Sequence, residues 1–196
     1  MKNLNIVNTQ LLFSSTVCFL FLFNTGLVNA QDVYLCVWRN PERTMTKIFP
    51  EAKDYSTINL KVTPQQCDSI EKELGSKLLA GQRDQFQYFK MTGNAGKPVG
   101  TIIAASQKGE FGAIEFVIGF DTSGNVVDLY IQRSRERDQT FKDRSFLDSF
   151  KGAGINDFEK LKTMAANTKS SGQKAVIHGL VKEMVTYKRL VGVHKE

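Results

Sequence analysis

The sequence predicts an α+β fold, an antiparallel β-meander flanked by helices, from two kinds of hydrophobic periodicity. In residues 111–120, isoleucine or phenylalanine recurs at every second position from Ile114, which is typical of a strand with one buried face. In residues 171–190, apolar side chains recur every three or four positions instead, which is typical of an amphipathic helix. Strands that are consecutive in the chain, with helices before and after them, favour the α+β class.

Two helices are predicted before the strands. Residues 41–49 form the first, which is short. Thr63 can cap the second, because Pro64 then takes the first helical position and Gln66 the third, where a capping box places Glu or Gln. Gly75 is the expected end of this helix, since glycine readily adopts the left-handed conformation that terminates helices.

The middle of the chain is predicted to hold the strands of the meander. These are residues 86–91, 99–106, 111–120 and 127–131. The tetrapeptide 121–124, Asp-Thr-Ser-Gly, has the composition of a hairpin turn. Val127, Leu129 and Ile131 are expected to face the same core as the strand before the turn, which leaves the other face of the sheet to solvent.

Three segments follow the predicted sheet. Residues 144–150 are expected to form a short helix with three apolar side chains toward the core. Residues 154–169 are predicted to be a polar connection. The last helix is predicted over residues 171–190.

Residues 1–30 are predicted to be a cleaved export signal, and residues 31–196 a single domain. Residues 11–28 are mostly apolar, and Val28 and Ala30 place small residues at positions −3 and −1 of a cleavage site after Ala30. A membrane anchor is the alternative, but polar residues near the end of a rather short apolar segment argue against it. The mature domain is therefore expected in the periplasm or otherwise outside the cytoplasm.

Charge and residue usage exclude several classes of function. The 26 Lys and Arg residues exceed the 20 Asp and Glu residues by 6, without the clustered basic stripe that nucleic-acid binding needs. Acidic proteins or a membrane surface are better candidate partners. Two histidines, three cysteines and the lack of HExxH or CxxC motifs exclude a multi-site zinc protein. A G-x-S-x-G motif is also missing, and His178 and His194 are better explained as packing or surface residues than as catalytic bases.

Cys36 and Cys67 remain after the predicted cleavage. In an oxidising compartment they can form a disulfide, or they can stay as buried or lone thiols, and the sequence favours neither. A disulfide would require their Cα atoms to lie within about 7 Å.

A polar run before the last helix is the most informative candidate binding site. Residues 165–172 are mostly small or carry hydroxyl groups, and a helix N-terminus presents free N–H groups and a positive dipole end that suit a phosphate. Lys169 adds a cation. Plain capping of the helix by Ser170 or Ser171 is the alternative.

A second candidate is the row of Arg133, Arg135 and Arg137 at the end of the last predicted strand, with Glu136 among them. Alternation along a strand places the three guanidinium groups on one face. They could hold a phosphate, haem propionates or an acidic partner. The alternative is a solvated strand end.

The order and spacing of these pieces resemble a known family. The pieces are Val33-Tyr34-Leu35, residues 49–52, the helix after Thr63, the hairpin around residues 121–124, residues 146–152, and Thr168-Lys169-Ser170-Ser171 with Ala175-Val176 in the last helix. Together they resemble the FMN-binding domain family, which includes the flavoprotein subunits of the sodium-pumping NADH:quinone reductase and Rnf complexes and a smaller exported branch. The resemblance covers residues 33–188 and implies an FMN-binding-domain-like fold.

The resemblance also implies an FMN site at the start of the last helix. The family motif there reads Asp-x-x-[Ser/Thr]-Gly-Ala-Thr, and a flavin transferase joins the FMN phosphate to its threonine. Thr168 matches this threonine, whereas Lys162 and residues 165–167 depart from the motif, which argues against covalent attachment at Thr168. The residues that the resemblance implies for FMN binding are Asn167, Thr168, Lys169, Ser170, Ser171, Arg135 and Glu136.

Two functions follow from the resemblance. The first is an exported electron-transfer protein that holds FMN, loosely or covalently, at the N-terminus of the last helix, with the flavin supplying the redox chemistry. Its partner would be a redox protein, either a cytochrome or a membrane respiratory complex. The second is a flavin-free interaction subunit of an exported redox complex, which the altered motif favours. In both, the chain is a carrier or binding module rather than an enzyme that turns over a substrate.

Overall fold

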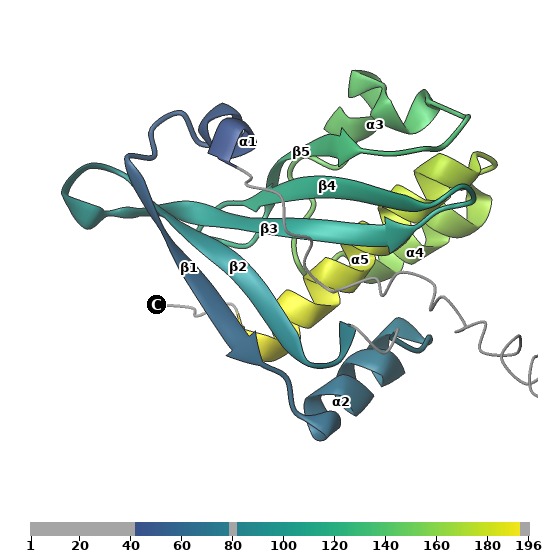
Figure 1. Cartoon of the computed structure of the whole chain (residues 1–196), viewed down its shortest axis with the longest axis horizontal. Coiled ribbons are helices and arrows are strands. Elements are labelled where there is room, and N and C mark those ends of the chain that lie inside the picture. The colour runs from purple at the N-terminus through teal and green to yellow at the C-terminus, as the bar shows by residue number, and fades with distance from the viewer. Residues whose placement is uncertain (1–41, 79–81, 193–196) are drawn as a thin grey trace, which may run out of the picture. The chain divides into compact units, whose positions relative to one another are not determined.

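A five-stranded antiparallel sheet forms the centre of the computed structural model, which describes residues 42–78 and 82–192 (Figure 1). Its strands are β1 (Asp54–Lys61), β2 (Gln85–Thr92), β3 (Pro98–Lys108), β4 (Ala113–Phe120) and β5 (Val126–Arg133). The spatial order follows the sequence order, and each neighbouring pair is antiparallel. The predicted meander of β2 to β5 is therefore confirmed, and β1 is an additional strand that the sequence analysis missed.

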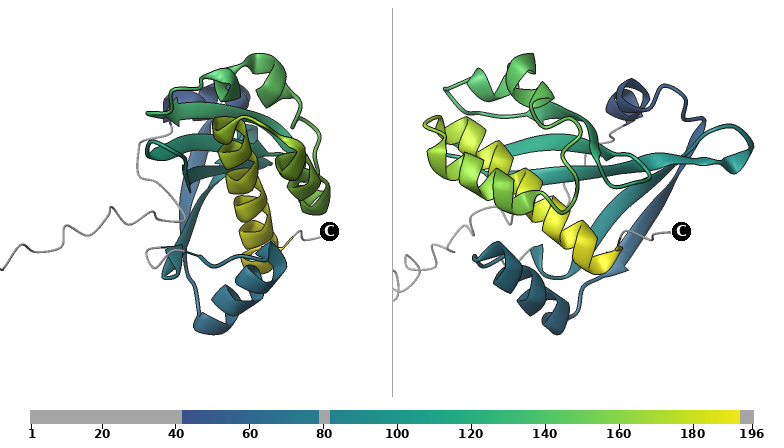
Figure 2. Two further views of the ribbon diagram at one scale, coloured as in Figure 1. Left: turned by 90° about the vertical axis from the view of Figure 1, so that its right-hand side faces the viewer. Right: turned by 180° about the vertical axis from the view of Figure 1, so that it is seen from behind.

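Helices accompany the sheet on both of its faces. They are α1 (Glu42–Ile48), α2 (Pro64–Leu74), α3 (Arg144–Asp148), α4 (Phe158–Asn167) and α5 (Ser171–Leu190), with two 3₁₀ turns, η2 (Asn94–Gly96) and η3 (Thr140–Lys142). The long helix α5 lies against one face of the sheet, where it contacts β3 and β4, and α2 and α4 pack against α5 (Figure 2). Helix α1 contacts β4 and β5. The predicted α+β class is confirmed.

Local sequence rules account for α2. The Thr63 hydroxyl oxygen accepts a hydrogen bond from the Gln66 N–H at 3.3 Å, and the Gln66 side-chain oxygen accepts one from the Thr63 N–H at 2.9 Å. This is the predicted capping box, with Pro64 in the first turn. Gly75 ends the helix with a φ of +72°, a left-handed conformation that glycine adopts without steric cost.

The predicted turn between β4 and β5 is also present. One carboxylate oxygen of Asp121 accepts hydrogen bonds from the N–H groups of Ser123 and Asn125, at 2.9 and 2.8 Å. Aspartate often bonds to the backbone two residues further on in this way, and it thereby closes turns.

A bulge in β5 overturns the prediction for Val127. Gly119 pairs with Asp128, but the next residue, Phe120, pairs with Val126, so Val127 is an extra residue in its strand. The extra residue turns the Val127 side chain to the sheet face opposite α5, where it packs against a second hydrophobic cluster.

Both faces of the central strands are buried, so the prediction that one face of the meander meets solvent is wrong. The cluster under α5 includes Ile103, Phe116 and Leu180. On the opposite face, Ile102 and Val117 belong to a separate cluster that α1 completes. The middle of β3 accordingly has seven consecutive buried residues instead of an alternating pattern.

The predicted polar connection, residues 154–169, contains helix α4 and is therefore also wrong. Phe158, Leu161 and Ala165 are buried at helical spacing, and α4 packs on α5. Charged and polar residues separate these three positions, so the apolar stripe is too narrow to distinguish the helix from a loop in the sequence.

Several predictions fall on residues outside the described ranges. The export signal in residues 1–30 and the Cys36–Cys67 disulfide stay predictions, because neither residues 1–30 nor Cys36 is described. Cys67 itself is buried, and its thiol donates a hydrogen bond to the Arg83 carbonyl oxygen at 3.3 Å. None of the described helices is long and apolar enough to cross a membrane.

Helix α5 carries a carboxyl group in the core under the sheet. Glu183 is 0% exposed, and neither of its side-chain oxygens has a hydrogen-bond partner among the described residues. The Lys182 ammonium lies 3.6 Å from its Oε1. Burial raises the pKa of Glu183 to about 8, because an ionised carboxylate is poorly solvated in an apolar interior. The raised pKa favours the protonated form of the Glu183 carboxyl at neutral pH.

This shift makes the stability of the protein depend on pH in a defined direction. The pKa of Glu183 is higher in the folded state than its ordinary value of 4.5, so its stabilising contribution is complete below pH 4.5 and is lost as the pH rises toward 8. For Glu183→Gln, which does not titrate, we expect the unfolding free energy relative to wild type to rise by on the order of a few kcal/mol between pH 5 and pH 8. Urea unfolding at the two pH values measures this difference. The exposed Glu51→Gln is the control, and a difference for Glu183→Gln that does not change with pH would contradict the expectation.

Candidate functional site

Three segments that are distant in the sequence meet at the N-terminal end of α5 (Figures 1 and 2). They are the turn between β3 and β4 (residues 108–112), the segment after β5 (residues 133–140) and the residues around the start of α5 (residues 167–172). We call this region the α5 corner. It contains all seven residues that the sequence analysis implied for FMN binding, so the two candidate regions of the sequence form one region of the structure.

Ser170 caps α5 and also contacts a carboxylate. Its hydroxyl oxygen accepts a hydrogen bond from the Gln173 N–H at 3.1 Å, and its hydroxyl group donates to Asp138. The same Asp138 carboxylate accepts hydrogen bonds from the N–H and the hydroxyl group of Thr140, at 2.9 and 2.8 Å. The hydrogen bonds from Ser170 and Thr140 lower the pKa of Asp138, so the group is an anion at neutral pH.

Asp138 therefore supplies negative charge at the end of α5 where the sequence analysis expected a phosphate. A carboxylate near a helix N-terminus is stabilised by the positive end of the helix dipole, typically by about 0.3–1 kcal/mol at an exposed position. A phosphate at the same place would be repelled by this carboxylate. Capping by Ser170, the alternative interpretation of the sequence, is present in the structure.

The neighbouring hydroxyl groups are also hydrogen-bonded within the protein. Ser171 donates to a carboxylate oxygen of Glu110 at 3.1 Å, which links the start of α5 to the β3–β4 turn. Thr168 donates to the Met164 carbonyl oxygen at 2.8 Å. Asn167 is the last residue of α4, so Thr168 caps the end of that helix instead of lying in an open loop.

Glu136 is buried and holds the β3–β4 turn. It is 4% exposed, and its Oε1 accepts a hydrogen bond from the Phe111 N–H at 2.9 Å. A side chain at Gly109 would collide with this carboxylate, so the turn approaches Glu136 as closely as a glycine permits. Glu136 therefore has a structural contact that accounts for its position in the corner.

The arginines beside Glu136 are exposed. The Arg137 guanidinium lies over the Phe111 ring, 4.7 Å from its centre, and Phe111 is 41% exposed. Arg135 makes no ion pair or hydrogen bond with the described residues, whereas Arg133 lies 3.9 Å from Glu115. An exposed aromatic ring with two outward guanidinium groups can contact carboxylates on another molecule.

The sequence analysis missed Asp138, Glu110 and Phe111 as parts of the site. Asp138 precedes Thr140 in a local turn, but its contact with Ser170 spans 32 residues, and the contact between Glu110 and Ser171 spans 61. No local pattern reports such pairs. Among the described residues, no group of three or more metal-binding side chains is present.

Comparison with known proteins adds no family assignment. No family model matches the chain, and no curated protein matches it. The arrangement of the α5 corner is therefore the main basis for a functional proposal.

The hydrogen bonds at the corner predict that Ser170 contributes more than Thr168 to the free energy of unfolding. Ser170→Ala removes the cap of α5 and the hydroxyl donor to Asp138, so we expect a loss of about 1 kcal/mol in the free energy of unfolding. Thr168→Ala removes one bond to a helix-end carbonyl that water can replace, and we expect less than half of that loss. Urea unfolding of both variants measures the difference. Equal losses would show that Ser170 has no special role in the corner.

Proposed function

We propose that this chain is a flavin-free interaction module that binds an acidic partner protein at the α5 corner. The Asp138 carboxylate at the N-terminus of α5, hydrogen-bonded to Ser170, argues against FMN at that place. The exposed Arg135 and Arg137 beside it are the observation that favours an acidic partner. FMN phosphate at that place would have to displace Asp138 and compete with it for the Ser170 hydroxyl group. The alternative function, FMN-dependent electron transfer, would require the phosphate to bind at the exposed Arg135, Arg137 or Lys169 and not at the capped N-terminus of α5.

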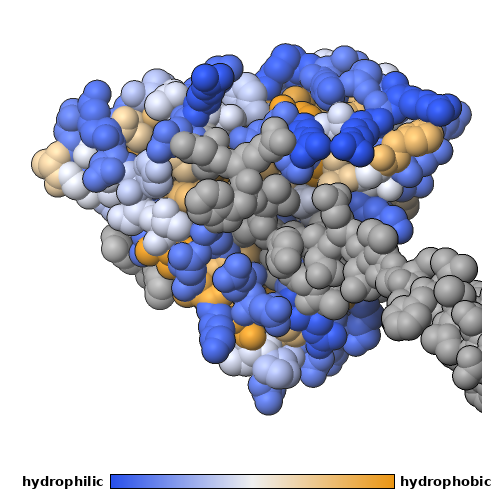
Figure 3. All heavy atoms as spheres, viewed as in Figure 1, coloured by the Kyte–Doolittle hydropathy of each residue, from blue (hydrophilic) through white to orange (hydrophobic). Residues whose placement is uncertain are grey.

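The carboxylates of the corner are hydrogen-bonded within the chain, whereas its arginines are exposed, and this difference supports an acidic partner. The carboxylates of Glu136, Asp138 and Glu110 each accept hydrogen bonds from groups of this chain. Arg135 and Arg137 face solvent without a carboxylate partner among the described residues. The three segments of the corner hold five basic residues (Lys108, Arg133, Arg135, Arg137 and Lys169) and three acidic ones (Glu110, Glu136 and Asp138), so their formal charge is 5 − 3 = +2. Figure 3 shows that hydrophilic residues dominate the visible surface over β5 and α3, with small apolar areas between them.

Arginine and an exposed aromatic ring are common anchors of protein interfaces. A guanidinium group binds a carboxylate through two parallel hydrogen bonds, and Arg and aromatic residues are enriched among the residues that dominate binding energy. The net charge of +6 would add attraction at long range to an acidic protein. The resemblance suggests that the partner belongs to an exported redox complex, such as a cytochrome or a membrane respiratory complex.

The first test asks whether the chain binds FMN at all. We expect no saturable change in FMN fluorescence with wild-type protein up to about 100 μM, because the phosphate position is occupied by Asp138. Absorption spectra of protein purified from its native host should likewise lack flavin bands. Binding by wild type that Ser170→Ala or Thr168→Ala weakens about tenfold would overturn the proposal in favour of an FMN carrier.

The second test measures the contribution of the two arginines. Binding of a biotinylated decaglutamate peptide is measured by biosensor at low ionic strength, and we expect Arg135→Ala with Arg137→Ala to weaken it about tenfold. The control is Lys61→Ala with Lys72→Ala, which removes the same charge from exposed positions on β1 and α2. Equal weakening by both pairs would show attraction to net charge only. Binding of phosphatidylglycerol vesicles, but not of the peptide, would replace the acidic protein by a membrane surface.

A further inference from the structure

Strand β1, residues 54–61, forms an open edge of the sheet (Figure 1). Among the described residues, β2 is the only strand that pairs with β1, and the pairing runs from Asp54 to Lys61 without a bulge. The inner residues 55–60 include no charged residue and no proline. Such an edge presents unpaired backbone N–H and C=O groups, with which a further strand can pair.

The opposite edge of the sheet, β5, is blocked by other parts of the chain. The Val126 N–H donates to the Ala153 carbonyl oxygen at 2.9 Å, and the Val126 carbonyl oxygen accepts from the Gly152 N–H at 2.8 Å. The Arg144 guanidinium donates to the Leu129 carbonyl oxygen at 3.2 Å, and a bulge interrupts the strand. Proteins commonly block sheet edges with bulges and covering segments. This chain therefore blocks one edge of its sheet and leaves the other open.

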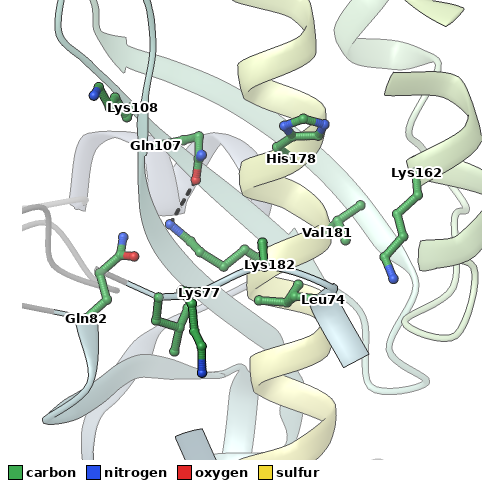
Figure 4. A pocket seen from close by; sticks show the side chains of 11 residues that line it. Leu74, Lys77, Gln82, Gln107, Lys108, Lys162, His178, Val181 and Lys182 are labelled. Atoms are coloured by element: carbon green, nitrogen blue, oxygen red, sulfur yellow. Dashed lines mark hydrogen bonds between the residues drawn. The ribbon is translucent and has the colours of Figure 1, made fainter. Parts of the chain in front are cut away.

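Polar groups of the cleft between α2, α5 and the end of β3 are bound within the chain (Figure 4). The Lys182 ammonium donates to the Ser106 carbonyl oxygen and to the Gln107 side-chain oxygen, the latter at 3.2 Å. The Lys77 ammonium lies 2.6 Å from Glu71. Because these two cations have partners in the chain, the edge of β1 is favoured over the cleft as a contact with another molecule.

The backbone groups of β1 point alternately to β2 and to the open edge. The N–H of Val62, which directly follows β1, donates to the Asp84 carbonyl oxygen at 3.0 Å, in register with β2. Since the direction alternates along an antiparallel strand, Thr57 and Asn59 direct their N–H and C=O groups away from β2. Tyr55 agrees with this pattern, because its N–H donates to the preceding side chain at 2.8 Å.

The residues of β1 match one another in an antiparallel pair formed by two copies. With a two-fold axis at Ile58, this residue lies opposite its own copy, and Thr57 lies opposite Asn59 of the second copy. Tyr55 then lies opposite Lys61, so no two like charges of β1 face each other. Ile58 is half-buried at the edge, and its copy would cover apolar surface that is still exposed.

The two nearest symmetric registers are less favourable. An axis one residue earlier places Lys53 directly opposite Lys61, which is a destabilising pair of like charges. An axis one residue later extends the pairing to Pro64, where α2 begins. The register with Ile58 at the axis avoids both conflicts, so the sequence of β1 is complementary to a second copy of itself.

We propose that two copies of this chain associate through antiparallel pairing of their β1 strands, with the two-fold axis at Ile58. Both copies use the same surface, so the assembly closes at a dimer. The sheet continues across the dimer, and the edges that remain are the two blocked β5 edges. The proposal is independent of the partner surface at the α5 corner, which includes the segment after β5 at the other edge of the sheet.

Sedimentation equilibrium of the full chain, purified from its native host, tests the proposal. Wild type should change from monomer to dimer between about 1 and 100 μM, as expected for a small interface. Thr57→Lys with Asn59→Lys should weaken the dimer about tenfold, because lysines then face each other twice across the axis. The matched control is Thr57→Lys with Asn59→Glu, in which opposite charges face each other and the dimer should be retained. Both positions are exposed, and circular dichroism checks that each variant is folded.

A disulfide cross-link tests the register. Opposite residues of a non-hydrogen-bonded antiparallel pair have Cα atoms about 4.5 Å apart, within the range of a disulfide. Ile58→Cys should therefore give a covalent dimer under mild oxidation. Thr57→Cys is the control, because it would lie about 7–8 Å from its own copy, too far for a disulfide.

Three results would overturn the proposal. They are a wild type that stays monomeric up to about 100 μM, equal dimerisation of the two charge variants, and equal cross-linking of the two cysteine variants. A monomeric wild type that binds a strand of a different protein at β1 would replace the second copy by that protein, and it would overturn the proposal as well.

Discussion

Helix α5 approaches the sheet region more closely than a helix with side chains at every position could, because glycine occupies two of its contact points. A Cβ atom added at Gly179 would lie 2.5 Å from the Phe116 ring, and one added at Gly172 would lie 2.5 Å from the Phe141 ring. Protein interiors are close-packed, so these contacts restrict both the position and the rotation of α5. The first turn of α5 thereby reaches the β3–β4 turn.

Features that depend on neighbouring residues could be predicted from the sequence, and features that depend on distant residues could not. The capping box at Thr63 and the turn at Asp121 involve contacts within four residues. The long apolar stripe of α5 is also a local pattern. Strand β1 was missed because its side chains are exposed or half-buried at the edge of the sheet. The bulge at Val127 was missed because it depends on the pairing with β4.

The chemistry of the candidate site also depends on a residue that is distant in the sequence. A run of small and hydroxyl residues before a helix is compatible with both an anion site and a self-contained cap. The difference lies in Asp138, whose position relative to Ser170 is set by the path of the chain after β5. The row of arginines could be identified in the sequence, but the inward turn of Glu136 and the exposure of Phe111 depend on the β3–β4 turn.

The contacts of the β3–β4 turn have a consequence for the order of events during synthesis of the chain. Glu110 contacts Ser171, and the Phe111 N–H contacts Glu136, so consecutive residues of the turn are held by two later segments. Contacts between distant residues cost loop-closure entropy, which is larger when more chain lies between them. A nascent chain that ends after β5 would carry Arg133 but not the arranged corner. The contacts of Asp138 and Glu110 with the start of α5 can therefore form only after the last helix has been synthesised.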